Sequence, residues 1–275
     1  MSQSLDKKLI AGTGIEVSPL GLGTVKFGRN QGVKYPAQFA IPDDGEILRL
    51  LELAHELGVN VLDTAPAYGT SEERLGQLFA RHKGLRQRWV ICGKVGEEFT
   101  TTDDNQGHSH FDFSEQHIRY SVERSLKRLN TDVIELMLVH SSGDDVNIIE
   151  QTGCLEVLAA LKKEGKILAS GMSTKTVEGG IAALQQADVA MVTYNLNDQH
   201  EKPVLDYAEA NNKGIFIKKA FASGHACLSG DDPVLASLKL VFDHPAVSCA
   251  IIGTINPEHL RQNVTACLRA LTKLV

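Results

Sequence analysis

The sequence predicts a (β/α)8 barrel with an N-terminal β-hairpin, and three observations support this fold class. Eight short apolar runs, rich in β-branched residues, alternate with segments of helical periodicity. The runs are almost continuously apolar, as is typical of parallel strands covered on both faces. Nothing among the 275 residues resembles a linker, so we expect a single domain over residues 1–275. An open, doubly wound sheet is the alternative that the pattern alone allows.

The eight expected strands follow one another along the whole chain. They are SPLGLGT from Ser18, VNVLDTA from Val59, RWVICGKV from Arg88, VIELMLVH from Val133, KILASGMST from Lys166, VAMVTYN from Val189, GIFIKKA from Gly214 and VSCAIIGT from Val247.

Apolar residues at helical spacing predict helices within 47–57, 118–129, 155–161 and 260–271. Ser114 is the expected N-cap of the second of these helices, while Gly58 and Gly165 are expected to end the first and third. Residues 26–42 and 97–113 are expected to be irregular. Each stretch follows the carboxyl end of a strand, where barrels build their substrate sites.

Composition and charge exclude several classes of partner. With 28 Lys+Arg against 34 Asp+Glu, the net charge of -6 provides no broad positive field for nucleic acid. No window approaches the roughly 18 apolar residues of a membrane span, and the first residues lack the apolar core of a secretory signal. The five cysteines form no CxxC pair, which favours reduced, buried thiols and a cytoplasmic protein. We expect a small-molecule substrate and a monomer or small homo-oligomer.

Four polar side chains come at the carboxyl ends of three consecutive expected strands: Asp63, Tyr68, Lys94 and His140. Because these ends meet at one mouth of a barrel, the four groups can form one site. A buried Lys94 ammonium needs a carboxylate partner, and Asp63 is the nearest candidate. Lys94 would stabilise the Tyr68 phenolate and lower its pKa, while His140 could hydrogen-bond a substrate oxygen.

Each of these side chains also has a structural interpretation. His140 could be a hydrogen-bonded strand end, Asp63 an Asx-turn residue and Tyr68 a loop aromatic. A metal-dependent hydrolase using His108, His110, His140 and an Asp is a further alternative. Because His108 and His110 lie in a Gly/Asp/Asn/Ser-rich loop rather than at a strand end, we expect no metal site.

Four segments resemble motifs of the aldo-keto reductase family: LDTAPAYGTSEERLG, ICGKVG, SVERSLKRLNTDVIELMLVH and IIGTINPEHLRQNV. The resemblance extends over residues 9–264, and LIAGTGIEVSPLGLGT is similar to the family's N-terminal hairpin and first strand. It implies a barrel that uses NADP, with NAD as the alternative, to reduce aldehydes or ketones or to oxidise the matching alcohols or sugars. Tyr68 would be the general acid and base, tuned by Asp63 and Lys94, and His140 would orient the carbonyl. A cofactor-binding regulatory subunit on the same fold is the alternative from another class.

The resemblance also implies a set of cofactor-binding residues. They are Gly23, Thr24, Asp63, Ser173, Thr174, Met191, Lys218, Lys219, Phe221, Ser223, Gly224, Gly253, Thr254, Asn256, His259, Gln262 and Asn263. Gly253 and His259 stand where the family often has a Lys and an Arg for a 2'-phosphate, and Lys218 or Lys219 could supply such a contact instead. The chain ends with its last helix, so we expect no long C-terminal substrate loop and an open pocket for small aldehydes or sugars.

Overall fold

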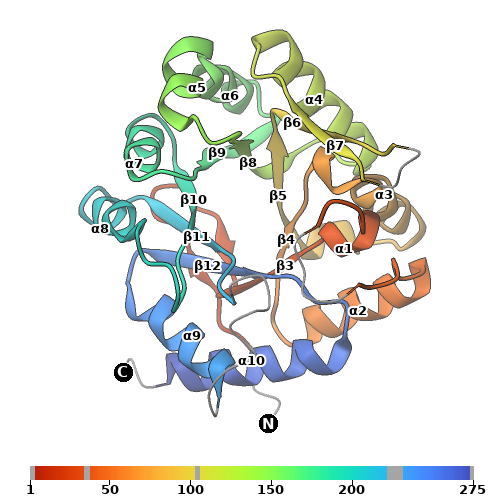
Figure 1. Ribbon diagram of the computed structural model, residues 1–275. Coiled ribbons are helices and arrows are strands. Elements are labelled where there is room, and N and C mark those ends of the chain that lie inside the picture. The colour runs from red at the N-terminus through yellow and green to blue at the C-terminus, as the bar shows by residue number, and fades with distance from the viewer. Residues whose placement is uncertain (1–3, 34–37, 103–105, 222–231, 273–275) are drawn as a thin grey trace.

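The eight apolar runs form eight parallel strands that close into a barrel in the computed structural model, which describes residues 4–33, 38–102, 106–221 and 232–272 (Figure 1). Each run expected to be a strand contains one, so this prediction is confirmed and the open-sheet alternative is wrong. The order around the barrel is β10-β11-β12-β3-β4-β5-β8-β9. In chain order the strands are β3 (Leu20–Gly23), β4 (Val61–Asp63), β5 (Val90–Val95), β8 (Ile134–His140), β9 (Ile167–Ser173), β10 (Val189–Thr193), β11 (Gly214–Lys218) and β12 (Val247–Ile252).

Helices surround the ring of strands. The main ones are α2 (Asp44–Glu56), α3 (Ser71–Arg81), α4 (Glu115–Arg128), α6 (Cys154–Lys163), α7 (Val177–Gln186), α8 (Lys202–Ala210), α9 (Pro233–Asp243) and α10 (Pro257–Leu271). The Ser114 side chain accepts a hydrogen bond from the His117 N–H and caps α4, as its sequence position predicts. Gly58 and Gly165 follow α2 and α6 with positive φ, a conformation that glycine adopts at low cost.

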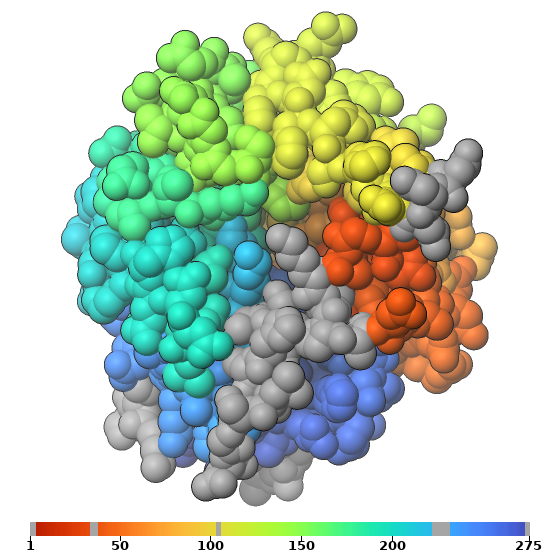
Figure 2. Space-filling model, in the orientation of Figure 1, coloured from red at the N-terminus to blue at the C-terminus, as the bar shows by residue number. Residues whose placement is uncertain are grey.

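Shorter helices occur in the connections: α1 (Val25–Gly28), α5 (Asp145–Thr152), and the 3-10 turns η1 (Pro66–Tyr68) and η2 (Arg86–Arg88). The first and last strands of the barrel, β3 and β12, pair in parallel, and α2 packs against α10. Figure 2 accordingly shows red and orange N-terminal elements beside the blue C-terminal helices. The first and last strand–helix units of the barrel are therefore neighbours.

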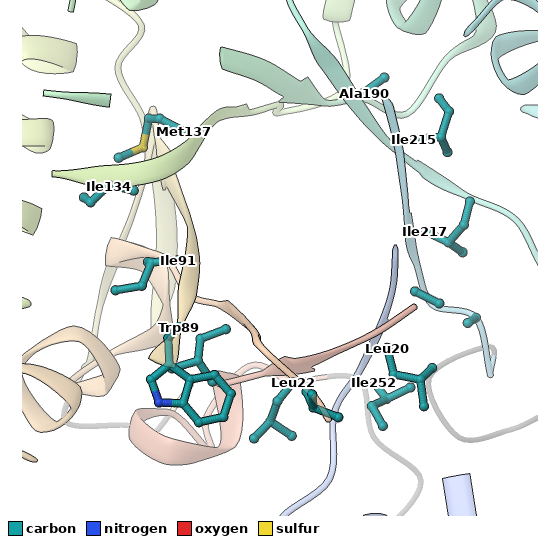
Figure 3. Close-up of a cluster of buried hydrophobic side chains, with 14 of the residues drawn as sticks. Leu20, Leu22, Trp89, Ile91, Ile134, Met137, Ala190, Ile215, Ile217 and Ile252 are labelled. Carbon is teal, nitrogen blue, oxygen red and sulfur yellow. The ribbon is translucent and has the colours of Figure 1, made fainter. Parts of the chain in front are cut away.

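Two apolar layers hold the barrel together. The larger lies between the strands and the helices and includes Ile91, Met137 and Ile217; Figure 3 shows part of it around the strand ring. The smaller fills the barrel interior and includes Ile10 and Val17 from the N-terminal hairpin. This hairpin, β1 (Lys8–Leu9) paired with β2 (Glu16–Val17), closes the barrel at the end opposite the carboxyl ends of the strands, as predicted.

The segment 97–113 differs from its predicted irregular conformation. It contains an antiparallel hairpin in which β6 (Glu97–Thr100) pairs with β7 (His108–Phe111). The Phe99 ring lies 3.4 Å from the Arg29 guanidinium carbon, so a contact distant in sequence stabilises strands that local residues alone do not indicate. The hairpin carries the first residue of β6, Glu97, to the mouth of the barrel.

Cys92, Cys154, Cys249 and Cys267 are buried free thiols, and Cys227 lies outside the described residues. In the described part of the chain, no helix combines the length and apolarity needed to cross a bilayer.

Candidate active site

Four side chains from neighbouring elements meet at the carboxyl ends of the strands. Asp63 ends β4, Lys94 lies one residue before the end of β5, and His140 ends β8. Tyr68 ends the 3-10 turn η1 that follows β4. Because β4, β5 and β8 are adjacent in the barrel, their carboxyl ends bring these four residues to one cavity, as the sequence predicts.

Lys94 and Asp63 form a buried ion pair. Only 1% of Lys94 and 3% of Asp63 is exposed. The Lys94 ammonium donates hydrogen bonds to Asp63 Oδ1 and, at 3.0 Å, to the carbonyl oxygen of Thr64. Burial lowers the pKa of Lys94, but Asp63, with smaller contributions from Tyr68 and Cys92, outweighs this effect, and the pKa is raised above the usual value. The ammonium therefore stays charged in a place where water does not solvate it.

Tyr68 lies against this ion pair. Its hydroxyl donates to Asp63 Oδ2 at 3.3 Å, and Lys94 Nζ lies 5.0 Å from the centre of its ring. Burial and the Asp63 charge raise the pKa of Tyr68, and Lys94 lowers it by less. Lys94 does lower the pKa of Tyr68, as predicted. The predicted net lowering of that pKa is wrong, however, because desolvation of the phenolate has the larger effect. Tyr68 is thus a neutral hydroxyl, able to donate a proton.

His140 pairs with a carboxylate that the sequence did not single out. Its Nδ1 lies 2.7 Å from Glu97 Oε2, and its ring contacts that of Tyr68 edge-on with 6.4 Å between the centroids. Burial raises the pKa of Glu97, but His140, Ser109 and Arg29 together lower it to about 2. Burial, together with the charges of Lys94 and Lys218, lowers the pKa of His140 by more than Glu97 raises it. At neutral pH, Glu97 is therefore charged and the His140 imidazole is mostly neutral.

Arg29 is a second residue that the sequence did not indicate. Its guanidinium donates to the carbonyl oxygens of Gln31, Gly32 and Ala67 at 2.8 to 3.2 Å. Stacked on Phe99, it brings a positive charge close to Glu97 and Tyr68. The hairpin register that creates these neighbours comes from contacts between distant segments, which explains why local sequence gave no signal for either Arg29 or Glu97.

A cavity of about 830 Å3 opens above these residues, within the range of small-molecule and cofactor sites. It extends from the four polar side chains to β11, the end of β12 and the start of α10. The sequence-predicted residues that line it are Gly23, Asp63, Tyr68, Lys94, His140, Ser173, Met191, Lys218, Lys219, Phe221, Gly253, Thr254, His259, Gln262 and Asn263. Arg29 and Glu97 line it as well.

Three predicted cofactor residues, Thr24, Thr174 and Asn256, are not among the residues that line the cavity. Thr24 donates to the Asp63 carbonyl oxygen at 3.0 Å, and the Thr174 hydroxyl lies 3.4 Å from Glu201 Oε1. The Asn256 side chain accepts hydrogen bonds from the backbone N–H groups of Glu258 and His259 and thereby caps α10. Ser223 and Gly224 lie outside the described residues.

Lys218 ends β11 and lines the cavity. Its Nζ donates to Ser173 Oγ at 3.0 Å and to the Thr174 carbonyl oxygen. Burial lowers the pKa of Lys218 to about 8, although Glu201 acts in the opposite direction. Lys219 follows with a φ of 55°, an uncommon conformation for a residue other than glycine. This end of the cavity therefore suits an anionic or strongly polar group.

His108 and His110 are exposed on β7. Among the residues that the structure describes, no group of three or more His, Cys, Asp or Glu side chains is placed to hold a metal ion.

Comparisons with known proteins agree with this geometry. The sequence matches the Aldo/keto reductase family over residues 19–227. It is 34% identical over 207 residues to Aldo-keto reductase YhdN of Bacillus subtilis, covering 74% of this chain and 58% of that protein. The chain thus spans less than two thirds of that relative. D-threo-aldose 1-dehydrogenase of a Pseudomonas species is 28% identical over 238 residues, covering 78% of this chain and 69% of its own.

A solved structure resembles the whole chain closely. It is PA4992 of Pseudomonas aeruginosa, described as an aldo-keto reductase, which is 57% identical. The superposition has a TM-score of 0.86 and covers 98% of this chain and 97% of that one.

Proposed function

Because the chain belongs to the aldo/keto reductase family, we propose that it is an NAD(P)-dependent oxidoreductase that reduces an aldehyde or ketone, or oxidises the matching alcohol or sugar. One observation carries the proposal: a neutral phenol, a buried ammonium–carboxylate pair and an imidazole meet at one end of a cavity that is large enough for a cofactor and a small substrate.

The residues of β11, β12 and α10 that line the cavity fit a nicotinamide dinucleotide. The partly buried Lys218 ammonium has neutral oxygen atoms as hydrogen-bond partners, so it can also contact an anionic group. His259, Gln262 and Asn263 add polar contacts from the first turns of α10, where the helix dipole favours negative charge. Lys218 and Lys219 lead us to propose NADP rather than NAD as the preferred cofactor. When bound, the reduced nicotinamide supplies a hydride to the carbonyl carbon.

The chain's own residues control the proton and the orientation of the substrate. In reduction, the Tyr68 hydroxyl donates its proton to the substrate oxygen, and in oxidation the phenolate takes it back. The Lys94 ammonium stabilises that phenolate, because it is fixed 5.0 Å from the ring by Asp63 and Thr64. His140, on the neighbouring strand, orients the substrate oxygen.

The relatives suggest the substrate class. The relative named as an aldose dehydrogenase makes sugars, together with small aldehydes, the first compounds to test. We propose a polar carbonyl compound or the corresponding alcohol as the substrate.

The experiment is a turnover assay that follows NADPH or NADH absorbance with a panel of aldehydes, ketones and aldoses. We expect multiple turnovers with at least one compound, and a fall in kcat of about 10²- to 10⁴-fold for Tyr68→Phe. Cofactor binding by the variant, measured by protein fluorescence, should match that of the wild type. Binding without turnover across the panel would instead indicate a regulatory subunit.

A further inference from the structure

Glu97 and His140 form a carboxylate–imidazole pair at the edge of the cavity. The Nδ1 atom of His140 is buried and lies 2.7 Å from Glu97 Oε2. The other Glu97 oxygen accepts a hydrogen bond of 2.6 Å from the Ser109 hydroxyl, which holds the carboxylate in place across the β6–β7 hairpin. The pair therefore joins the hairpin to the end of strand β8.

This close approach favours a proton on one particular ring nitrogen of His140. An ionised carboxylate only accepts hydrogen bonds, so a proton between Glu97 and His140 belongs to Nδ1. A neutral imidazole with its proton on Nδ1 has a lone pair on Nε2. The ring lines the cavity with 21% of its side chain exposed, and Nε2 is the nitrogen left to contact a molecule there.

A carbonyl oxygen also carries lone pairs, so it needs a donor. Neutral His140 offers it only an acceptor, whereas imidazolium, protonated on both nitrogens, offers Nε2–H. We propose that Glu97 is a positioning residue that fixes the His140 proton on Nδ1, so that His140 donates to a substrate carbonyl only as an imidazolium ion. This inference rests on the proposed carbonyl reduction.

The groups facing His140 set the direction of its pH dependence. They are Glu97 on β6, Lys94 on β5, Lys218 on β11 and the Tyr68 hydroxyl after β4. Asp63 lies beyond Lys94 and is paired with it. Burial and the two lysines favour neutral His140, and Glu97 favours the charged form. The donating form is therefore lost as the pH rises, at a lower pH than for an exposed histidine.

The pH profile of kcat/KM for the carbonyl substrate, measured with the cofactor saturating at every pH, tests the proposal. For the wild type we expect kcat/KM to fall about tenfold per pH unit above the pKa of His140, since one proton is lost. In Glu97→Gln the amide N–H can donate to Nδ1, which places the ring proton on Nε2. We expect the profile of this variant to be nearly flat between about pH 6 and pH 9, and to exceed the wild type at the alkaline end.

Glu98→Gln is the matched control. Glu98 is the next residue of β6 and pairs with Arg124 and His117 rather than with the cavity residues. It should keep the wild-type pH profile. A wild-type profile without the alkaline fall, or the same fall in Glu97→Gln, would overturn the proposal.

Nitrogen-15 NMR of the histidine rings gives a readout that does not depend on turnover. The His140 signals are assigned by their loss in His140→Gln. We expect protonated Nδ1 and bare Nε2 in the wild type, and the reverse in Glu97→Gln. Protonated Nε2 in the neutral wild-type ring would refute the inference and leave the proposed function intact. Nδ1–H together with no turnover of any carbonyl would support the fixed tautomer and refute the proposed function.

Discussion

The two walls of the cavity are built differently. On the wall formed by β4, β5 and β8, the polar groups bind one another: Lys94 binds Asp63, Tyr68 binds Asp63, and His140 pairs with Glu97. On the wall formed by β11, β12 and the start of α10, the lining includes glycine, threonine and amide side chains around Lys218. Catalysis requires that the participating side chains be fixed relative to each other. Binding of a long ligand can instead be distributed over many weaker contacts.

The largest expected effect concerns the first wall, formed by β4, β5 and β8, and is that of Lys94→Met on stability. This change leaves the buried Asp63 carboxylate without its cation, so we expect the free energy of unfolding to fall by about 3 to 5 kcal/mol. Urea denaturation followed by circular dichroism measures it. Removing both charges in Asp63→Asn/Lys94→Met should recover part of the loss, because no unpaired charge then remains buried.

Lys166→Met is the matched control for that variant. Lys166 pairs with Glu123 and Glu164 at the surface, where water screens both partners. It should unfold at nearly the wild-type urea concentration. If Lys94→Met is as mild as this control, the buried pair does not organise the first wall.

The same contrast explains how much of the molecule could be predicted from the sequence. Strand positions follow from eight apolar runs, because burial on both faces of a parallel sheet leaves a strong local pattern. Asp63, Tyr68, Lys94 and His140 could be grouped because strand order fixes which carboxyl ends are adjacent.

The remaining features depend on contacts that local sequence does not reveal. Glu97 reaches His140 through a hairpin that is stabilised partly by the packing of Phe99 on Arg29. The pKa of Tyr68 is raised by desolvation, which depends on the complete three-dimensional surroundings of the ring. Pattern analysis therefore finds the four residues that meet at the cavity but misses Glu97, which pairs with one of them.

An added positive charge on the second wall, formed by β11, β12 and the start of α10, should increase the preference for NADPH over NADH. His259 lies exposed at the start of α10 and lines the cavity. His259→Arg replaces a weak anion ligand by a bidentate one, so we expect the affinity for NADPH to rise about tenfold. Affinity for NADH, which lacks the 2'-phosphate, should change by less than about twofold. Fluorescence titration with both cofactors measures the ratio, and an equal gain for both would show that the 2'-phosphate is not bound near this residue.

The titration of Lys218 predicts a pH effect on the same wall. Since burial lowers its pKa to about 8, the ammonium is charged below that pH and becomes neutral above it. Affinity for the anionic cofactor should therefore decrease severalfold as the pH rises from about 7 to about 9. Lys218→Met should bind more weakly at neutral pH and show a flatter profile. Calorimetry at constant ionic strength provides both curves, and parallel curves for the two proteins would exclude Lys218 as the source of the pH effect.

The smallest expected effects should distinguish a residue of α10 that contacts the cofactor from a residue that stabilises the helix. Asn263 lines the cavity, whereas Asn256 caps the helix through the backbone N–H groups of Glu258 and His259. Asn263→Ala should weaken cofactor binding severalfold and change the melting temperature little. Asn256→Ala should instead lower the free energy of unfolding by about 1 kcal/mol, with a smaller effect on affinity. If Asn256→Ala weakens binding more than Asn263→Ala does, the cap itself contributes to recognition, and the second wall depends on helix geometry as strictly as the first depends on its buried charges.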